Sequence, residues 1–212
     1  MVIAIDGPAG AGKSTVARGV ARTLGFTYLD SGAMYRAVAL AALDRGIDPD
    51  DGERLGELAW DLDIDFDGDT IRLGGKPVEG RIRSPEVTLA ASRVSVHPQV
   101  RQAMVKRQRE LIASGNYVAE GRDIGTVVSP DSPLKIFLRA EETARAERRA
   151  RESGESVNEV LQAMQERDRR DKERADSPLR QADEAIEIDT TALTPDEVVQ
   201  RIADLARERG IA

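Results

Sequence analysis

The chain has 212 residues, no cysteine, one histidine and a formal net charge of −7. This composition excludes disulfides, thiolate metal sites and histidine clusters, and the acidic balance argues against an extended nucleic-acid surface, which needs summed positive charge. No apolar run approaches the roughly 20 residues of a membrane span, and no charged leader precedes the first apolar run, so we expect a cytoplasmic protein that binds neither membranes nor nucleic acid.

The first expected element is a strand formed by the apolar run Val2–Ile5 and ended by Asp6. A helix with Val16, Val20 and Leu24 on one face is expected downstream, with Gly25 at its end. The loop between them fits the pattern G-x-x-x-x-G-K-[ST]. Strand, loop and helix in this order are the setting of a phosphate-binding loop. Its residues are Gly7, Pro8, Ala9, Gly10, Ala11, Gly12, Lys13, Ser14 and Thr15.

The residue types of this loop explain its chemistry. Glycines let several backbone N–H groups point at one anion, and the helix that follows adds its positive end. Lys13 supplies a charge for the β- and γ-phosphates, Ser14 places a hydroxyl where a phosphate-bound Mg²⁺ needs a ligand, and Thr15 adds a second hydroxyl. The loop therefore predicts that the chain binds a nucleoside triphosphate together with Mg²⁺.

The next elements are a short strand over 26–29, a helix over 33–43 that carries Arg36 in its first turns, and a short helix over 53–60. From Asp61 apolar residues alternate with aspartates, and turns at 67–69 and 74–75 indicate a small antiparallel meander. Ser84 and Pro85 begin a helix over 85–94. Another helix is expected over 99–113, with a basic exposed face that includes Arg101, although a single arginine could point inward.

A buried strand over 117–119 runs into Glu120–Thr126, and charged residues at that end of a strand are where open α/β sheets bind ligands. The structural alternative is a tight turn with an internal Arg122–Asp123 ion pair. After a strand over 134–138 the chain is helical and highly charged up to Ala175, with Glu141 and Arg145 as an expected i,i+4 pair. Strand 185–189 and a capped helix from Thr194 complete the chain.

Five short apolar strands that alternate with helices predict an α/β fold, namely a five-stranded parallel sheet with helices on both faces. The antiparallel meander and the arginine-rich helical hairpin are additions to this scaffold, and additions to a scaffold often carry specificity. A GTPase would need a guanine-reading Asn-Lys-x-Asp motif, which the sequence lacks. A small-molecule kinase needs an acceptor pocket and a mobile cover, for which arginines from Arg36 to Arg122 and the helix carrying Arg167 and Arg174 are candidates.

Three further motifs carry a family resemblance: Leu29–Arg36 (LDSGAMYR), Glu120–Thr126 (EGRDIGT) and Glu166–Arg174 (ERDRRDKER). Together with the phosphate loop, and in this order, they resemble bacterial cytidylate kinase over essentially the whole chain. At position 120, where this family often carries Asp, the chain has Glu. Either carboxylate could reach Mg²⁺ through a water molecule.

The resemblance implies transfer of the γ-phosphoryl group of ATP to CMP or dCMP in pyrimidine nucleotide metabolism, by a monomer that uses Mg²⁺. It implies one domain over 1–212, with a core over 1–60 and 98–212, a nucleoside-monophosphate-binding insert over about 61–97 and a lid over about 153–176. Lys13, Arg122, Arg167 and Arg174 would be catalytic. The substrate would be bound by Ser31, Arg36, Ser92, Arg101, Arg122, Asp123, Arg167, Asp171 and Arg174.

Within this set, Arg36 and Arg122 would hold the acceptor phosphate, with Ser31 nearby, and Asp171 would meet the sugar hydroxyls. Ser92, Arg101 and Asp123 would face the cytosine. A carboxylate can accept a hydrogen bond from the cytosine amino group, and uracil reverses the donor and the acceptor at that edge. Two alternatives remain open: a kinase for another small acceptor such as UMP, AMP or shikimate, and a non-catalytic P-loop protein that senses nucleotides or binds nucleic acid.

Overall fold

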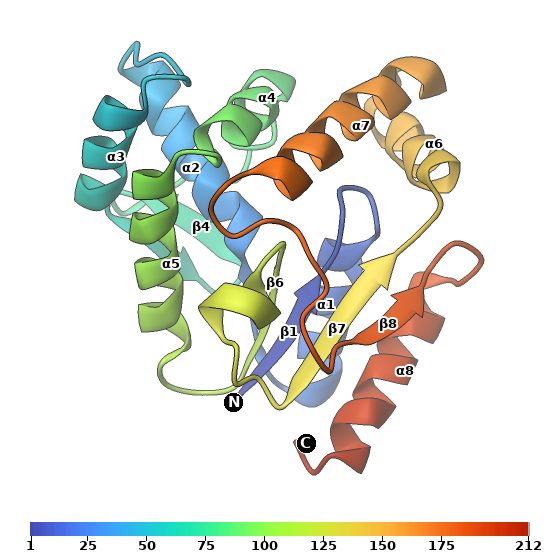
Figure 1. Cartoon of the computed structure of the whole chain (residues 1–212). Coiled ribbons are helices and arrows are strands. Elements are labelled where there is room, and N and C mark those ends of the chain that lie inside the picture. Colours follow the sequence, from blue (N-terminus) through green and yellow to red (C-terminus); the bar gives the residue numbers. More distant parts are fainter. Residues whose placement is uncertain (212) are drawn as a thin grey trace. The chain divides into compact units, whose positions relative to one another are not determined.

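The main sheet has five strands in the order β2-β6-β1-β7-β8 (Figure 1). The computed structural model describes residues 1–211, apart from the side chain of Glu152. β1 pairs in parallel with β6 and with β7, and β7 pairs in parallel with β8. The expected five-stranded parallel sheet is therefore confirmed. Its strands are β1 (Val2–Asp6), β2 (Thr27–Asp30), β6 (Tyr117–Gly121), β7 (Leu134–Arg139) and β8 (Ile186–Asp189).

Two helices bury apolar faces against this sheet, α1 (Lys13–Leu24) and α8 (Pro195–Glu208). They pack against each other and share one core cluster with the strands, which includes Val16 and Val20 of α1 and Ile202 of α8. α1 ends at Gly25, whose N–H bonds to the Ala21 carbonyl in a left-handed conformation. α8 begins with the expected capping box of Thr194 and Glu197.

The charged region between β7 and β8 forms two packed helices, α6 (Glu142–Ser153) and α7 (Val157–Glu173). Gly154 ends α6 in a left-handed conformation, and Ser156 starts α7 with a capping box. A one-turn π-helix, η1 (Ile124–Val128), follows β6, where the sequence indicated only a loop.

The chain between Asp30 and Ala113 forms a second compact unit, separate from Met1–Leu29 and the chain from Ser114 onward. It holds α2 (Ser31–Asp44), α3 (Gly52–Asp61), α4 (Pro85–Val94) and α5 (Pro98–Ile112), with α2 packed on α4 and α3 on α5. The unit spans more residues than the expected 61–97 insert, because α2 packs with α4 and β4 and also with α3 and α5.

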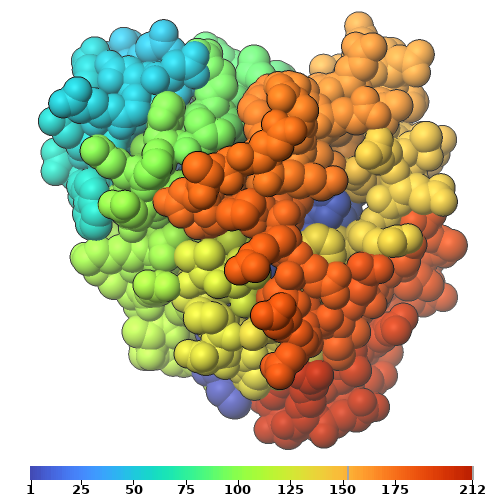
Figure 2. Space-filling view, viewed as in Figure 1, coloured from blue at the N-terminus to red at the C-terminus, as the bar shows by residue number. Residues whose placement is uncertain are grey.

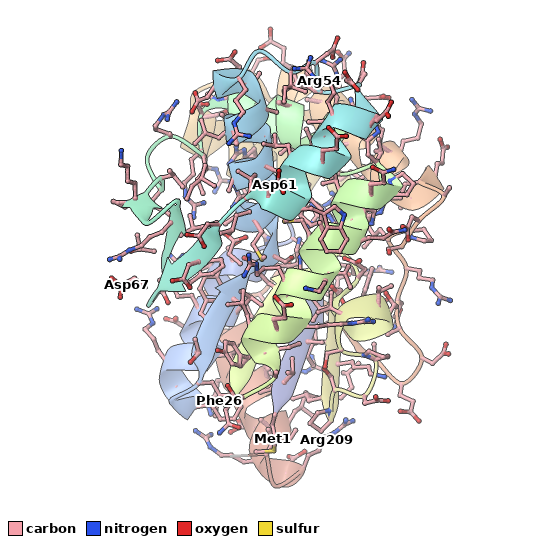
Figure 3. The ribbon with its side chains drawn as sticks, turned by 90° about the vertical axis from the view of Figure 1, so that its left-hand side faces the viewer. Met1, Phe26, Arg54, Asp61, Asp67 and Arg209 are labelled. Carbon is pink, nitrogen blue, oxygen red and sulfur yellow. The ribbon has the colours of Figure 1, made fainter. Side chains whose placement is uncertain are left out.

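The meander is a three-stranded antiparallel sheet of β3 (Ile64–Asp67), β4 (Thr70–Leu73) and β5 (Lys76–Pro77), as the alternation of apolar residues and aspartates predicts. Figure 3 shows Asp67 at the tip of the β3–β4 hairpin and Arg54 and Asp61 along α3. Among the helices that the structure describes, none combines the length and the apolar character needed to cross a membrane.

Candidate active site

The phosphate loop connects β1 to α1. Gly10 and Gly12 adopt left-handed φ angles of 72° and 85°, which glycine tolerates without strain, and α1 begins directly at Lys13. The Lys13 side chain is buried, and its Nζ donates a hydrogen bond to the Pro8 carbonyl at 2.7 Å. Ser14 and Thr15 are exposed on the first turn of α1. Backbone donors, one buried cation and two accessible hydroxyls therefore meet at this end of α1.

Burial and nearby charges of both signs act on the Lys13 ammonium. Burial lowers the pKa of the Lys13 ammonium from 10.5 to about 7, and the nearby Arg122 and Arg167 guanidinium groups lower it further, whereas Glu120 and Asp171 oppose this. Three cations within electrostatic reach of one another are unfavourable unless an anion joins them. Glu120 and Asp171 balance part of this positive charge, and a phosphate is the kind of anion that could join the three cations.

The sheet register places the second motif beside this loop. Asp6 at the end of β1 pairs with Gly121 at the end of β6, so the chain leaves both strands at the same edge. Arg122 follows directly, and its Nε donates to the Asp171 carboxylate at 2.8 Å. Burial favours a lower pKa for Arg122, but the Asp171 carboxylate outweighs it and raises that pKa. Arg122 thus pairs with Asp171 of α7 rather than within its own turn.

Asp171 is the acceptor that joins these arginines. Burial acts to raise its pKa, but Arg122 and Arg167 outweigh burial and hold the pKa below its usual value, so the carboxylate is ionised near neutral pH. Arg174 Nη1 lies 3.8 Å from the same carboxylate, and its Nη2 lies 3.9 Å from Asp123. One part of the structure therefore brings together Lys13, Arg122, Asp123, Arg167, Asp171 and Arg174.

The expectation that one helix carries both Arg167 and Arg174 is wrong. α7 ends at Glu173, and Arg174 is its C-cap residue with extended backbone angles. The Arg174 side chain is therefore free to turn inward, where it is 3% exposed and its Nε donates to the Ser177 carbonyl at 2.7 Å. The inward turn is what brings Arg174 to Asp123 and Asp171.

The loop that carries Arg122 and Asp123 is held by Asp6. The two carboxylate oxygens of Asp6 accept hydrogen bonds from the backbone N–H groups of Ile124 at 2.9 Å and Gly125 at 2.8 Å, at the start of η1. Burial raises the pKa of Asp6 to about 6, against the lowering effect of these two bonds. π-Turns occur frequently at functional sites, and here the turn fixes the backbone next to Arg122.

A second buried carboxylate, Glu120, lies near the end of β6. Its Oε1 accepts a hydrogen bond from the Tyr28 hydroxyl at 2.6 Å, and the Arg18 guanidinium lies 4.9 Å from the centre of the Tyr28 ring. Glu120 raises the pKa of Lys13, so its negative charge acts on the phosphate loop.

The second compact unit holds the other expected site residues. Asp30 caps α2 by accepting from the Ala33 N–H at 2.8 Å, and it also accepts from Arg36 Nη2 at 2.9 Å. Arg36 Nε is buried without a hydrogen bond among the described residues, so the group has a donor left for an anion. Ser31 is buried in the first turn of the same helix.

Arg101 of α5 points inward, as the sequence allowed. Its side chain is 1% exposed, its guanidinium lies 5.4 Å from the centre of the Tyr35 ring, and its Nη1 donates to the Ser95 carbonyl at 3.2 Å. Tyr35 belongs to α2, so Arg101 lies beside the helix that carries Ser31 and Arg36. Ser92 is buried on α4, which packs on α2.

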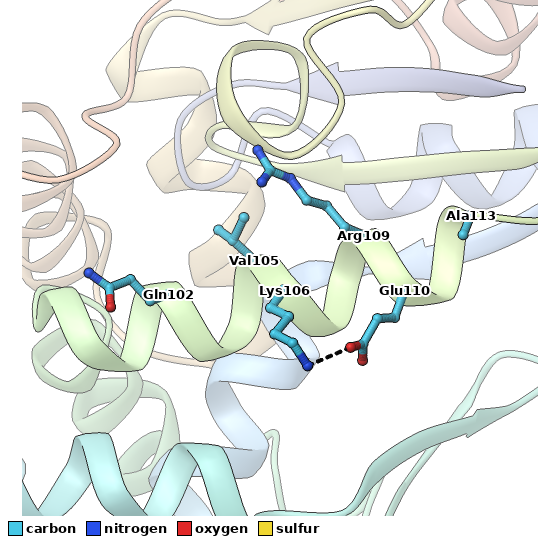
Figure 4. A pocket seen from close by; sticks show the side chains of 6 residues that line it. All are labelled: Gln102, Val105, Lys106, Arg109, Glu110 and Ala113. Carbon is cyan, nitrogen blue, oxygen red and sulfur yellow. Dashed lines mark hydrogen bonds and ion pairs between the residues drawn. The ribbon is translucent and has the colours of Figure 1, made fainter.

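The surface of α5 also has a shallow hollow, which is lined by other residues than the site residues described above (Figure 4). Its only drawn interaction is the exposed Lys106–Glu110 ion pair at 2.7 Å, of a kind that contributes little. None of the expected site residues lines it. The lining residues are Gln102, Val105, Lys106, Arg109, Glu110 and Ala113.

The sequence of the whole chain matches that of one family. The family described as cytidylate kinase matches residues 3–208. The chain belongs to the cytidylate kinase family. It is 49% identical to a protein named cytidylate kinase from Solibacter usitatus, a match that covers 99% of this chain and 93% of that protein. It is also 48% identical to a cytidylate kinase from Exiguobacterium sibiricum, with 96% of each chain covered.

A likeness to solved structures bears on the fold alone. A gluconokinase from Sinorhizobium meliloti is similar with a TM-score of 0.52 at 18% identity, and the match covers 99% of this chain and 93% of that one. The α/β architecture is thus shared with a kinase outside the cytidylate kinase family.

Four residues at this site escaped the sequence analysis. The position of Asp6 could have been predicted, since an acidic residue at the end of a buried apolar strand, directly before the phosphate loop, must lie buried beside that loop. The role of Tyr28 could not have been predicted, because its hydrogen-bond partner Glu120 is 92 residues away in the sequence. Arg145 was expected to pair with Glu141 at the surface, and this is wrong: it is 4% exposed and pairs with Asp168, which lay unassigned inside the third motif.

Proposed function

We propose that this chain transfers the γ-phosphoryl group of ATP to CMP or dCMP, which yields ADP and CDP or dCDP. The observation that supports this best is the buried Lys13 at the head of α1 with Arg122 and Arg167 in electrostatic reach, in a chain of the cytidylate kinase family. Such a concentration of positive charge suits two phosphate-bearing substrates that repel each other. Bringing them together is the main task of a phosphoryl-transfer enzyme.

On the donor side, the backbone of Gly7–Gly12 and the first turn of α1 bind the triphosphate of ATP, and Lys13 contacts the β- and γ-phosphates. The donor atoms fit Mg²⁺, because the Ser14 hydroxyl is exposed beside the loop and makes no hydrogen bond among the described residues. Mg²⁺ is held by few protein oxygens and keeps phosphates and waters as further ligands. When bound, it neutralises charge on the β- and γ-phosphates, and Ser14 is the residue that holds it.

On the acceptor side, Arg36 and Arg122 bind the CMP phosphate, with Ser31 close to Arg36. Arg122 is held by Asp171 before the substrate arrives, and Arg36 by Asp30. Each guanidinium is therefore oriented in advance and has other N–H groups to offer to a phosphate. Asp171 then meets the sugar hydroxyls.

The base is read by Ser92, Arg101 and Asp123. Asp123 is 5% exposed and Arg101 is 1% exposed, so both would act in a dry environment where unmatched polar groups are costly. The carboxylate accepts from the cytosine amino group and the guanidinium donates to the ring nitrogen and carbonyl oxygen. Uracil has a carbonyl oxygen where cytosine has the amino group, so it offers Asp123 no proton for a hydrogen bond.

The transfer step needs little covalent chemistry from the protein. The attacking group is a phosphate oxygen that is largely ionised near neutral pH, so no general base is assigned. Lys13, Arg122, Arg167 and Arg174 stabilise the charge that spreads over the migrating group. The segment over about 153–176 acts as the lid and that over about 61–97 as the insert for the monophosphate. A monomeric state and a cytoplasmic location remain predictions from the sequence.

The experiment that tests the base-reading assignment replaces Asp123 by Ala and compares CMP with UMP. We expect the preference in kcat/KM for CMP over UMP to fall by about 5- to 150-fold, the effect of one lost base contact, while the KM for ATP changes little. Replacing the exposed Asp131 by Ala is the matched control. An equal loss of activity with CMP and UMP would remove Asp123 from base recognition.

A further inference from the structure

A buried ion pair joins the phosphate loop to both helices of the lid region. Arg145 of α6 donates from Nη1 to Asp168 of α7 at 2.6 Å and to the Ala9 carbonyl at 2.7 Å. Asp168 in turn accepts from the Ala9 N–H at 3.2 Å. The backbone of one loop residue is therefore clamped on both of its polar groups by one arginine and one aspartate.

This clamp, formed by Arg145 and Asp168 around the backbone of Ala9, is buried from solvent. Arg145 is 4% exposed and Asp168 is 7% exposed, and Arg145 Nε donates to the Ala140 carbonyl at 3.2 Å. Removing one member of a buried pair leaves a charge without compensation, so the two residues depend on each other. Only the planar fork of arginine reaches two carbonyls and a carboxylate at once, and lysine would not replace it.

Apolar side chains pack closely around the ion pair and the loop. Ala9 belongs to a small apolar cluster with Ala146 of α6 and Met164 of α7. A Cβ on Gly10 would lie 3.2 Å from Arg145 Cβ, and the left-handed φ of 72° strains any other residue, so this position favours glycine. In Figure 2 the N-terminal segment, in blue, is visible between the orange α7 and the yellow β7–α6 segment.

The clamp also places the residues next to Asp168. Arg167 precedes it in the chain, and Asp171, which holds Arg122, follows one helical turn later. The charge of Arg167 already acts on Lys13 in the protein without nucleotide. A shift of α7 at Asp168 would therefore move Arg167 and Asp171 relative to the loop at the same time.

We propose that Arg145 and Asp168 are positioning residues for the donor nucleotide. They fix the loop backbone at Ala9 and hold Arg167 at the phosphate site before ATP binds. The inference deepens the proposed function and rests on it, because the phosphates concerned are those of ATP. Both side chains are buried and bonded to Ala9 and to each other, so we assign their effect to the loop and to α7 rather than to contact with the nucleotide.

The test uses Asp168→Asn and Arg145→Lys in the full chain. Asparagine keeps an oxygen for the Ala9 N–H but loses the charge, and lysine keeps the charge but loses the fork. We expect each substitution to raise the Kd for ATP, titrated without acceptor, by about tenfold or more, and to raise the KM for CMP by less, because Asp171 lies one helical turn from the ion pair whereas Ala9 is bonded to it directly. The double variant should lose little more than the worse single variant, because both act through one contact.

Gln165→Ala is the matched control. Gln165 Nε2 donates to Glu142 at 2.8 Å and thus joins the same two helices at an exposed point without touching the loop. We expect its Kd for ATP to stay within about twofold of the unmodified protein. A purely structural role of the ion pair would lower the melting temperature of the Arg145 and Asp168 variants and leave the ATP affinity of the folded protein unchanged, which would overturn the proposal.

If neither variant folds, hydrogen exchange of the unmodified protein tests whether Ala9 is held by the ion pair. The clamp predicts that the Ala9 amide of the unmodified, ATP-free protein exchanges slowly, and exchange at the rate of an open loop would overturn it. The ATP titration needs no acceptor, so the two proposals fail separately. ATP binding without CMP phosphorylation would contradict the proposed function alone, whereas CMP phosphorylation with unchanged Kd values in the variants would contradict the clamp alone.

Discussion

The charge of Lys13 depends on its burial and on its charged neighbours. Its pKa of about 7 in the free protein results from burial and from Arg122 and Arg167. The phosphates of ATP would favour the protonated form, so ATP binding above pH 7 must bring in a proton. We expect the Kd for ATP to rise by up to about tenfold per pH unit above 7, where free Lys13 is mostly neutral.

Isothermal titration in buffers of different ionisation enthalpy measures both the Kd and the proton uptake. Lys13→Arg is the control, because its guanidinium stays charged at every pH used and its weaker binding should not vary with pH. A Kd that stays constant between about pH 7 and pH 9 in the unmodified protein would contradict the lowered pKa of Lys13.

Asp6 predicts a pH dependence of stability. Its pKa is raised from 3.8 to about 6 by burial, so between these values the folded protein binds more protons than the unfolded chain, and stability falls as the pH rises. The upper limit of this loss is about 3 kcal/mol. Urea unfolding measures the free energy of unfolding of the protein and of the Asp6→Asn variant. The difference between the two values should change between pH 3.8 and about pH 6. A constant difference would mean that Asp6 ionises normally.

Single residues could be predicted where a motif specifies them. Lys13 and Ser14 follow from the loop pattern, and Arg122 from its place after a buried strand. The pairing of Arg122 with Asp171 joins residues 49 positions apart, and local pattern carries no information on such a contact. The same holds for Arg145, whose helix looks solvent-exposed in sequence because most of its other charged residues are.

At the scale of elements, α1 and α8 pack unusually closely at one point. A Cβ on Gly19 of α1 would lie 2.6 Å from Val199 Cγ2 of α8, and a β-branched side chain cannot easily move away. Gly19→Ala gains about 1 kcal/mol of helix propensity but overpacks the contact by about 1–3 kcal/mol. We expect a net loss of stability in urea unfolding, with kcat unchanged.

Val199→Ala identifies the cause of that loss. It should destabilise the unmodified protein, because it removes apolar contact, but should be neutral or stabilising when Gly19 is already Ala. If the two costs simply add, the helices do not meet at this point and the packing account of Gly19 is wrong.

Most elements could be predicted from periodicity and caps, because their signals are local. Ser84 and Thr194 cap α4 and α8 as expected, and the alternation from Leu62 to Phe66 correctly indicated β3. η1 could not be predicted, since its turn is stabilised by Asp6 from another strand. The end of α7 was placed too late, because its charged residues continue past the helix.

At the scale of the molecule, the α/β class follows from strands that alternate with helices. The order of the strands does not, since β6 inserts between β2 and β1 although these two are neighbours in sequence. The extent of the second compact unit also escaped prediction. Its helices α2, α3 and α5 look like ordinary parts of the scaffold, and only their packing with one another separates them.

The central claim concerns the reaction, and acceptor-dependent ADP formation tests it most directly. ATP and Mg²⁺ are incubated with the protein and with CMP, dCMP, UMP, AMP or GMP in turn. We predict that CMP and dCMP give the fastest ADP formation and that UMP is a poor substrate, since one mismatched base contact lowers kcat/KM by about 5- to 150-fold. If ATP binds but no acceptor accelerates ADP release, the proposed reaction and the acceptor-binding roles of Arg36, Arg101 and Asp123 are contradicted.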